Sequence, residues 1–200
     1  MMDYSPTELE AFVRKRAPEI AKDFRRVAKE ANNEADLVAE AEKVLEKFAD
    51  NFDIGLHLER ERTLINGRAD AVYNRFVVEY EPPGSLRENL SFSHNQHAVG
   101  LVQQYMDELE QLDRHRKERL AGVALDGNYY IFVRHRDDHW HIDEPIPVTA
   151  QSTETFLRYL LSLSTELALT PENLVRDFGE NTTVSRTVVR ILYETLGNTK

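Results

Sequence analysis

The chain has 200 residues, of which 41% are hydrophobic, contains no cysteine, and carries a formal net charge of −10 at pH 7. This length suits one compact domain whose core is large enough to fold unaided. Without cysteine, disulfides and thiolate zinc sites are excluded, so any metal must take oxygen or imidazole ligands. The acidic charge disfavours a protein that simply coats DNA. We find no signal peptide and no apolar run of about 18 residues, so we expect a cytoplasmic protein without a membrane partner.

Two helices are predicted in the first part of the chain. Residues 5–8, Ser-Pro-Thr-Glu, form a capping box with proline at the first helical position, which predicts a helix from about residue 6 to the high twenties. Asn33 is expected to cap a second helix. The apolar residues of this second helix recur at helical spacing and are Leu37, Ala41, Val44, Leu45 and Phe48.

The middle of the chain changes to the two-residue period of strands. Ile54, Leu56 and Leu58 alternate with other residues and predict a first strand, which two strand-like runs on either side of residues 74–75 follow. After Pro-Pro-Gly at 82–84, we expect a helix from about residue 95 to 114.

Further strands are predicted at residues 120–125 and 129–136, with an edge strand in 139–148, and helices return from Ser152 onward. This order predicts an α/β fold with a mixed, mainly antiparallel central sheet flanked by helices. We expect a single domain over residues 1–200, with a core up to about 150 and a helical part from about 151 to 200.

A hairpin in the middle of the chain brings acidic residues together. If Asn74-Arg75 is its two-residue loop, Asp70 lies opposite Glu79, and Glu81 shares their face with Arg68 as its partner. The opposite face is expected to form the core and holds Ala69, Ala71, Tyr73, Phe76, Val78 and Tyr80. Opposed β-carbons are about 4.5–5.5 Å apart, so two such carboxylates must repel each other or share a cation. Mg²⁺ suits such a site, because it takes one or two carboxylates and keeps waters for a phosphate.

Two alternatives remain open for this hairpin. A three-residue loop would shift the pairing and separate the acids. In the other alternative the acids lie on a solvated sheet face, where Arg68 neutralises Glu81 while Arg62 or Arg75 screens the remaining carboxylates.

Residues 67–73, GRADAVY, and 78–84, VEYEPPG, resemble the PD-(D/E)XK nuclease superfamily. Within it they are similar to the N-terminal nuclease domains of large restriction-modification proteins that also carry an adenine methyltransferase. The resemblance extends more weakly to residues 120–133 and 173–193. It implies a restriction-endonuclease-like fold and a Mg²⁺-dependent, type II-like deoxyribonuclease, with Mn²⁺ as a possible substitute. The implied partners are DNA and a methyltransferase or specificity domain or subunit, and a homodimer is compatible with it.

The resemblance also implies roles for single residues. Asp70 and Glu79 would be catalytic, metal-binding carboxylates, and Glu34 would add a third metal ligand from the first core helix. Glu34 is equally well explained as a first-turn acid favoured by the helix dipole. Glu81 holds the position of the family's lysine, where it would accept a proton from the attacking water or hold a second ion. The family's helical glutamine is replaced by Leu101.

These departures motivate an alternative function, a catalytically impaired nuclease fold that acts as a DNA- or protein-binding module. A third hypothesis is a small-molecule or assembly scaffold of α/β type.

Two further groups of residues could bind a metal ion or DNA. A histidine and aspartate cluster could bind zinc or could simply flank a tight turn at Asp137-Asp138, and it comprises His135, His139, His141, Asp137, Asp138 and Asp143. Basic clusters at residues 14–16, 25–26 and 114–119 could contact DNA phosphates or could be solvated helix surface.

Overall fold

The structure is a computed structural model that describes residues 6–50, 58–64, 67–73, 75–113 and 116–162. Its contacts divide the chain into two units, Met1–Ser164 and Thr165–Lys200. All described residues belong to the first unit. The helices predicted after residue 162 and the weaker resemblance at 173–193 therefore lie outside the described residues.

A 7-stranded mixed sheet forms the centre of this unit, in the order β1-β2-β3-β4-β5-β6, with β7 paired to β5. The strands are β1 (Leu58–Leu64), β2 (Gly67–Tyr73), β3 (Phe76–Tyr80), β4 (Ala121–Leu125), β5 (Tyr129–Arg136), β6 (His139–Ile142) and β7 (Ile146–Pro147). Only β3 and β4 pair in parallel, and the other neighbours are antiparallel. The predicted α/β fold with a mixed, mainly antiparallel sheet flanked by helices is confirmed.

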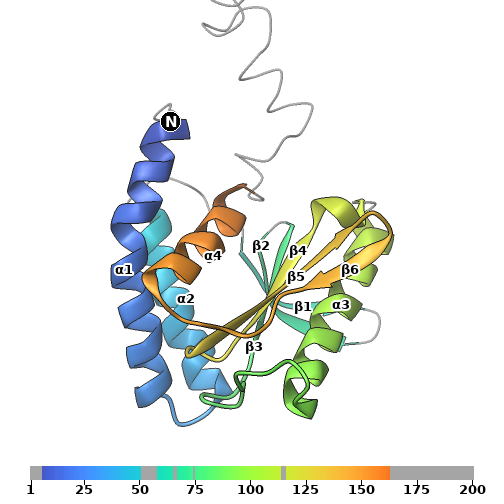
Figure 1. The fold of residues 1–200 in the computed structure, drawn as a ribbon, viewed down its shortest axis with the longest axis horizontal. Coiled ribbons are helices and arrows are strands. Elements are labelled where there is room, and N and C mark those ends of the chain that lie inside the picture. Colours follow the sequence, from blue (N-terminus) through green and yellow to red (C-terminus); the bar gives the residue numbers. More distant parts are fainter. Residues whose placement is uncertain (1–5, 51–57, 65–66, 74, 114–115, 163–200) are drawn as a thin grey trace, which may run out of the picture. The chain divides into compact units, whose positions relative to one another are not determined.

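Helices cover both faces of the sheet (Figure 1). On one side lie α1 (Pro6–Glu30), α2 (Glu34–Asp50) and α4 (Ala150–Ser162), and on the other lies α3 (Ser93–Asp113), which connects the parallel strands β3 and β4. A short 3-10 helix, η1 (Lys117–Arg119), precedes β4. None of the helices in the described part of the chain has the length and apolar content needed to cross a membrane.

The local signals placed most helix starts correctly. Helix α1 begins at Pro6, and the Asn33 side chain caps α2 by accepting a hydrogen bond from the Asp36 backbone N–H at 2.9 Å. The strand predicted over residues 54–58 lies almost entirely outside the described residues, and the observed β1 runs over Leu58–Leu64. Its sequence, LERERTL, is mostly charged, so pairing with β2 and not apolar alternation makes it a strand.

The core consists of two apolar layers, one on each face of the sheet. Aromatic rings dominate the layer under α1, α2 and α4, where Phe156 stacks on Tyr130 at 5.4 Å between ring centroids and meets Phe24 edge-on at 5.8 Å. On the opposite face, aliphatic residues of the sheet pack against α3. Residues of β3 alternate between these layers, so the strand is buried throughout.

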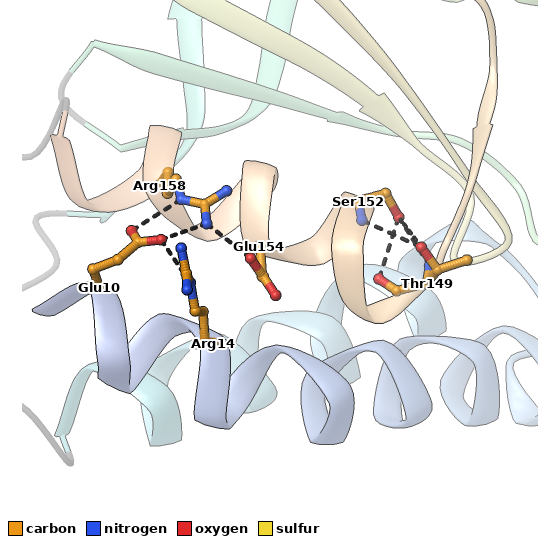
Figure 2. Close-up of polar contacts among 6 residues, drawn as sticks. All are labelled: Glu10, Arg14, Thr149, Ser152, Glu154 and Arg158. Carbon is orange, nitrogen blue, oxygen red and sulfur yellow. Dashed lines mark hydrogen bonds and ion pairs between the residues drawn. The ribbon is translucent and has the colours of Figure 1, made fainter.

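Polar contacts add to the packing of α4 on α1 (Figure 2). Arg158 donates hydrogen bonds to both carboxylate oxygens of Glu10, at 2.6 and 3.1 Å, and to Glu154 at 2.8 Å. The hydrogen bond from Arg158 is the main cause that lowers the pKa of Glu10 to about 2. Solvent screens this partly exposed pair, so the aromatic layer contributes most of the stability here.

The start of α4 is held by a reciprocal cap that Figure 2 also shows. The Thr149 backbone N–H donates to Ser152 Oγ at 2.9 Å, and the Ser152 N–H donates to Thr149 Oγ1 at 3.2 Å. Both donors would otherwise be unsatisfied at the helix N-terminus.

A glycine sets how closely α3 approaches the sheet. A β-carbon added at Gly122 of β4 would lie 2.2 Å from Val102 Cγ1 and 3.2 Å from Met106 Sδ, both on α3. A β-carbon added at Gly100, within α3 itself, would meet nothing within 4 Å. The two positions therefore form a matched pair for the same substitution.

We expect Gly122→Ala to lower the free energy of unfolding by about 1–3 kcal/mol, because the new methyl overpacks the contact between α3 and β4. Gly100→Ala should instead raise it by about 0.5–1 kcal/mol, because alanine is the better helix former. Urea unfolding of both variants measures the difference. Equal stability of the two variants would contradict the close approach at Gly122.

Candidate functional site

The predicted hairpin register is confirmed. Tyr73 lies opposite Phe76, and Ala71 lies opposite Val78, which is the pairing that a two-residue loop requires, so the three-residue alternative is wrong. Continued by one residue, the same register places Asp70 opposite Glu79. The backbone of Asp70 lies in β2, whereas its side chain is outside the described part of the structure.

The two acids at the end of β3 are buried. Glu79 is 7% exposed and Glu81 is 5% exposed. Their face also carries Val72 and Val77, which belong to the apolar layer under α3. The alternative of a solvated sheet face is therefore wrong at β3. The sequence did not reveal this cover, because α3 comes from a later part of the chain.

Glu81 extends β3 by one residue and contacts the start of α3. Its backbone N–H donates to the Leu125 carbonyl at 2.9 Å, and its Oε2 lies 2.7 Å from Nε2 of His94. Burial raises the pKa of Glu81, the charges of His94 and His97 oppose this, and the nearby Glu34 carboxylate raises it further.

The structure thus brings three elements together at one end of β3. Glu34 is the first residue of α2, and its charge raises the pKa of Glu81, although less than burial does. Glu79 and Glu81 come from β3 and its extension, and His94 comes from the first turn of α3. The contact with His94 was missed, because no local pattern links it to Glu81.

Two buried polar side chains fix the loop that joins β3 to α3. Asp126, 0% exposed, accepts hydrogen bonds from the N–H groups of Leu86 at 3.1 Å and of Asn128 and Tyr129 at 2.8 Å each. Burial raises the pKa of Asp126, while these hydrogen bonds act in the opposite direction. The Asp126 carboxylate therefore ties this loop to the turn between β4 and β5.

Asn95 holds the other end of the loop. Its Oδ1 accepts from the Arg87 N–H at 3.1 Å, and its Nδ2 donates to the carbonyls of Arg87 and Asn89 at 2.8 and 2.9 Å. These bonds fix the chain just before His94. The position of the His94 ring beside Glu81 therefore follows from the loop and not only from their own contact.

The donor groups at this end of β3 are of a type that suits a hard cation. Glu79 and Glu81 share one face of the strand, and the register adds Asp70 across the hairpin. Carboxylate oxygens are the ligands that Mg²⁺ prefers. Among the side chains that the structure describes, no three histidine, aspartate or glutamate groups lie close enough together to hold a metal ion, and Asp70 is not among these side chains.

The other clusters have structural explanations. Asp137 and Asp138 both have positive φ, 51° and 61°, as in the type I′ turn of a two-residue hairpin, so the predicted tight turn is confirmed. Basic residues of α1 pair with acids one turn away, such as Arg14 with Glu10 and Arg26 with Glu30. The solvated-surface interpretation fits these arginines.

No family model, curated protein or solved structure matches this chain. The resemblance to the PD-(D/E)XK superfamily therefore rests on the hairpin residues themselves.

We expect Glu81→Gln to raise the melting temperature at neutral pH in the presence of EDTA. Folding raises the pKa of Glu81 above its value in the unfolded chain. The protonated side chain therefore favours the folded state below the unfolded-state pKa, and this contribution is lost as the pH rises through the pKa of the folded state. The difference between variant and wild type should therefore grow from about pH 4 to neutral pH. Thermal unfolding at several pH values measures it.

Glu40→Gln, at an exposed position of α2, is the control and should show no such trend. A Glu81→Gln protein that melts below wild type at neutral pH would show that the contact with His94 outweighs the cost of burial.

Asp126→Asn should destabilise the fold by about 1–3 kcal/mol, because an amide N–H would face the Leu86 N–H that the carboxylate now accepts. Urea unfolding and the hydrogen exchange of the Leu86 amide test this. Asp138→Asn is the control, since asparagine tolerates its positive φ. Unchanged protection of Leu86 would contradict the role of Asp126.

Proposed function

We propose that this chain is a metal-dependent DNA endonuclease domain of the PD-(D/E)XK type, a module of a restriction-modification system that hydrolyses phosphodiester bonds. The observation that carries the proposal is the hairpin register, in which Ala71 lies opposite Val78. Continued by one residue, this register would set Asp70 opposite Glu79. Glu81 lies buried beside them, on the same face. This is the arrangement that the resemblance of residues 67–84 implies.

Asp70 and Glu79 would supply oxygen ligands to Mg²⁺, or to Mn²⁺ as a substitute. Glu34, the first residue of α2, would be the third carboxylate that the resemblance implies. When bound, the ion would polarise the scissile phosphate and lower the pKa of a bound water.

Glu81 would act on the attacking water in place of the family's lysine. Burial and Glu34 raise its pKa, which makes it a better proton acceptor than an ordinary carboxylate at neutral pH. His94 contacts Glu81 on one side and is partly exposed to solvent on the other. Its imidazole can orient Glu81 and pass the accepted proton on to bulk water.

The contact between Glu81 and His94 also favours a second candidate, a nuclease fold that binds DNA or protein without cleaving it. With an acid in the lysine position, the described part of the site lacks the ammonium group that would balance the charge of the attacking oxygen. A partner would then bind by the same fold, without the metal and independently of Asp70.

A nicking assay on supercoiled plasmid tests the nuclease. We expect the 200-residue chain to nick DNA with Mg²⁺ or Mn²⁺ and not with EDTA. Asp70→Ala and Glu79→Gln should abolish nicking, and Glu81→Gln should slow it by about 100-fold or more through loss of the proton acceptor. Glu40→Gln should cleave like wild type.

Circular dichroism must show that each variant is folded. Equal nicking by wild type and Asp70→Ala would reject the proposal. Calorimetry that finds no Mn²⁺ binding, together with unchanged DNA binding by Asp70→Ala, would instead support the binding module.

A further inference from the structure

Arg75 directly precedes β3, at the end of the strand opposite to the acids. Among the side chains that the structure describes, it is the one arginine or lysine that is buried. It is 8% exposed, and its Nε donates no hydrogen bond. No acid among the described residues neutralises it, so Arg75 does not screen Glu79 or Glu81. Burying an unpaired charge costs stability, so an arginine here needs a partner of some kind.

A second arginine lies beside it. The Arg75 carbonyl accepts a hydrogen bond from the Ala121 N–H at 3.1 Å, which holds the hairpin loop next to η1, whose last residue is Arg119. Arg119 is exposed. Arg119 is two residues before Ala121, so the same backbone contact brings the chain at Arg119 close to Arg75. Burial lowers the pKa of Arg75, and the charge of Arg119 lowers it further.

The acids near η1 interact with other basic groups. Lys117 Nζ forms ion pairs with Asp107 at 2.6 Å and with Glu110 at 3.2 Å. Glu118 faces His135, with 3.8 Å between Oε1 and Nδ1. The repulsion between Arg75 and Arg119 is therefore left without an acidic partner among the described residues.

We propose that Arg75 and Arg119 form a binding site for one phosphate group. Guanidinium groups present a planar set of N–H donors that matches phosphate oxygens, and two of them balance the charge of a phosphate dianion. The buried Arg75 is held in place before the ligand arrives, so little side-chain entropy is lost on binding. The exposed Arg119 closes the site from the solvent side.

The phosphate could belong to the DNA backbone or to a small phosphorylated molecule. Arg75 and Glu79 are four residues apart along the chain, or about 13 Å at about 3.3 Å per residue. Measured along the axis of B-DNA, this equals the rise of about four nucleotides at about 3.4 Å each. The DNA source rests on the proposed nuclease function, whereas the phosphate site itself does not.

Thermal unfolding in sodium phosphate and in sodium chloride of equal ionic strength tests the site. Phosphate should raise the melting temperature of wild type and leave that of Arg75→Met unchanged. In chloride, Arg75→Met should melt at or above wild type, because it removes an unpaired buried charge. Arg119→Gln, a surface change, should keep the fold and weaken phosphate binding at least tenfold.

Arg26→Gln, at an exposed and paired arginine of α1, is the control and should respond to phosphate like wild type. The NMR signal of the Arg75 Nε–H group gives a direct readout and should move as phosphate is added. If phosphate changes neither this signal nor the melting temperature of wild type, or if Arg119→Gln keeps full phosphate affinity, the proposal is wrong.

Binding of a short DNA duplex in EDTA at several salt concentrations distinguishes the two sources. A salt dependence that falls by about one phosphate contact in Arg119→Gln identifies the DNA backbone. Unchanged DNA binding, with phosphate binding lost, identifies a small phosphorylated ligand. If the chain binds phosphate but does not nick DNA, the phosphate site at Arg75 and Arg119 is supported and the proposed nuclease function is rejected.

Discussion

Hydrogen bonding along both edges of β3 is the constraint on which the rest of this structure depends. The strand pairs antiparallel with β2 and parallel with β4, and helices cover both of its faces. A strand held in this way can neither slip nor rotate, since a shift of one residue would exchange its two faces. The side chains at its two ends are therefore fixed in position by the core, the acids at one end and Arg75 at the other.

The same confinement makes the charges at both ends costly. Glu79 and Glu81 lie largely out of water, where a carboxylate needs hydrogen bonds or a cation, and Arg75 has the opposite need at the other end. The aromatic and aliphatic layers supply the stability that offsets these costs.

Local signals in the sequence were enough for much of the fold. The Asn33 cap, the start of α1 and the two-residue hairpin loop each depend on residues close together in the chain, and all were predicted correctly. What the sequence did not show depends on distant segments. The charged segment β1 is a strand because it pairs with β2. Glu79 is buried because α3 packs on that face of the sheet.

The candidate site divides in the same way. The opposition of Asp70 and Glu79 follows from the hairpin register, which short-range turn chemistry sets. The approach of His94 and Glu34 to Glu81 does not, since it depends on where two helices begin relative to the sheet. The hydrogen bond from Leu86 to Asp126 joins residues that are far apart in the chain. The hydrogen bonds of Asn95 are local, but no sequence pattern in this loop predicts them.

Two glycines, one within β4 and one in the turn that follows it, limit how far this architecture can change. At Gly122 there is no room for a β-carbon beneath α3, and at Gly127, whose φ is +81°, a β-carbon would lie 2.6 Å from Ala28 Cβ of α1. At these two positions a helix therefore lies close to the backbone, whereas elsewhere the side chains of the two apolar layers fill the space between helices and sheet. A sheet clamped in this way has little mechanical compliance across its thickness. During evolution, the ends of β3 can be enlarged by lengthening loops at the rim, but not by separating the layers.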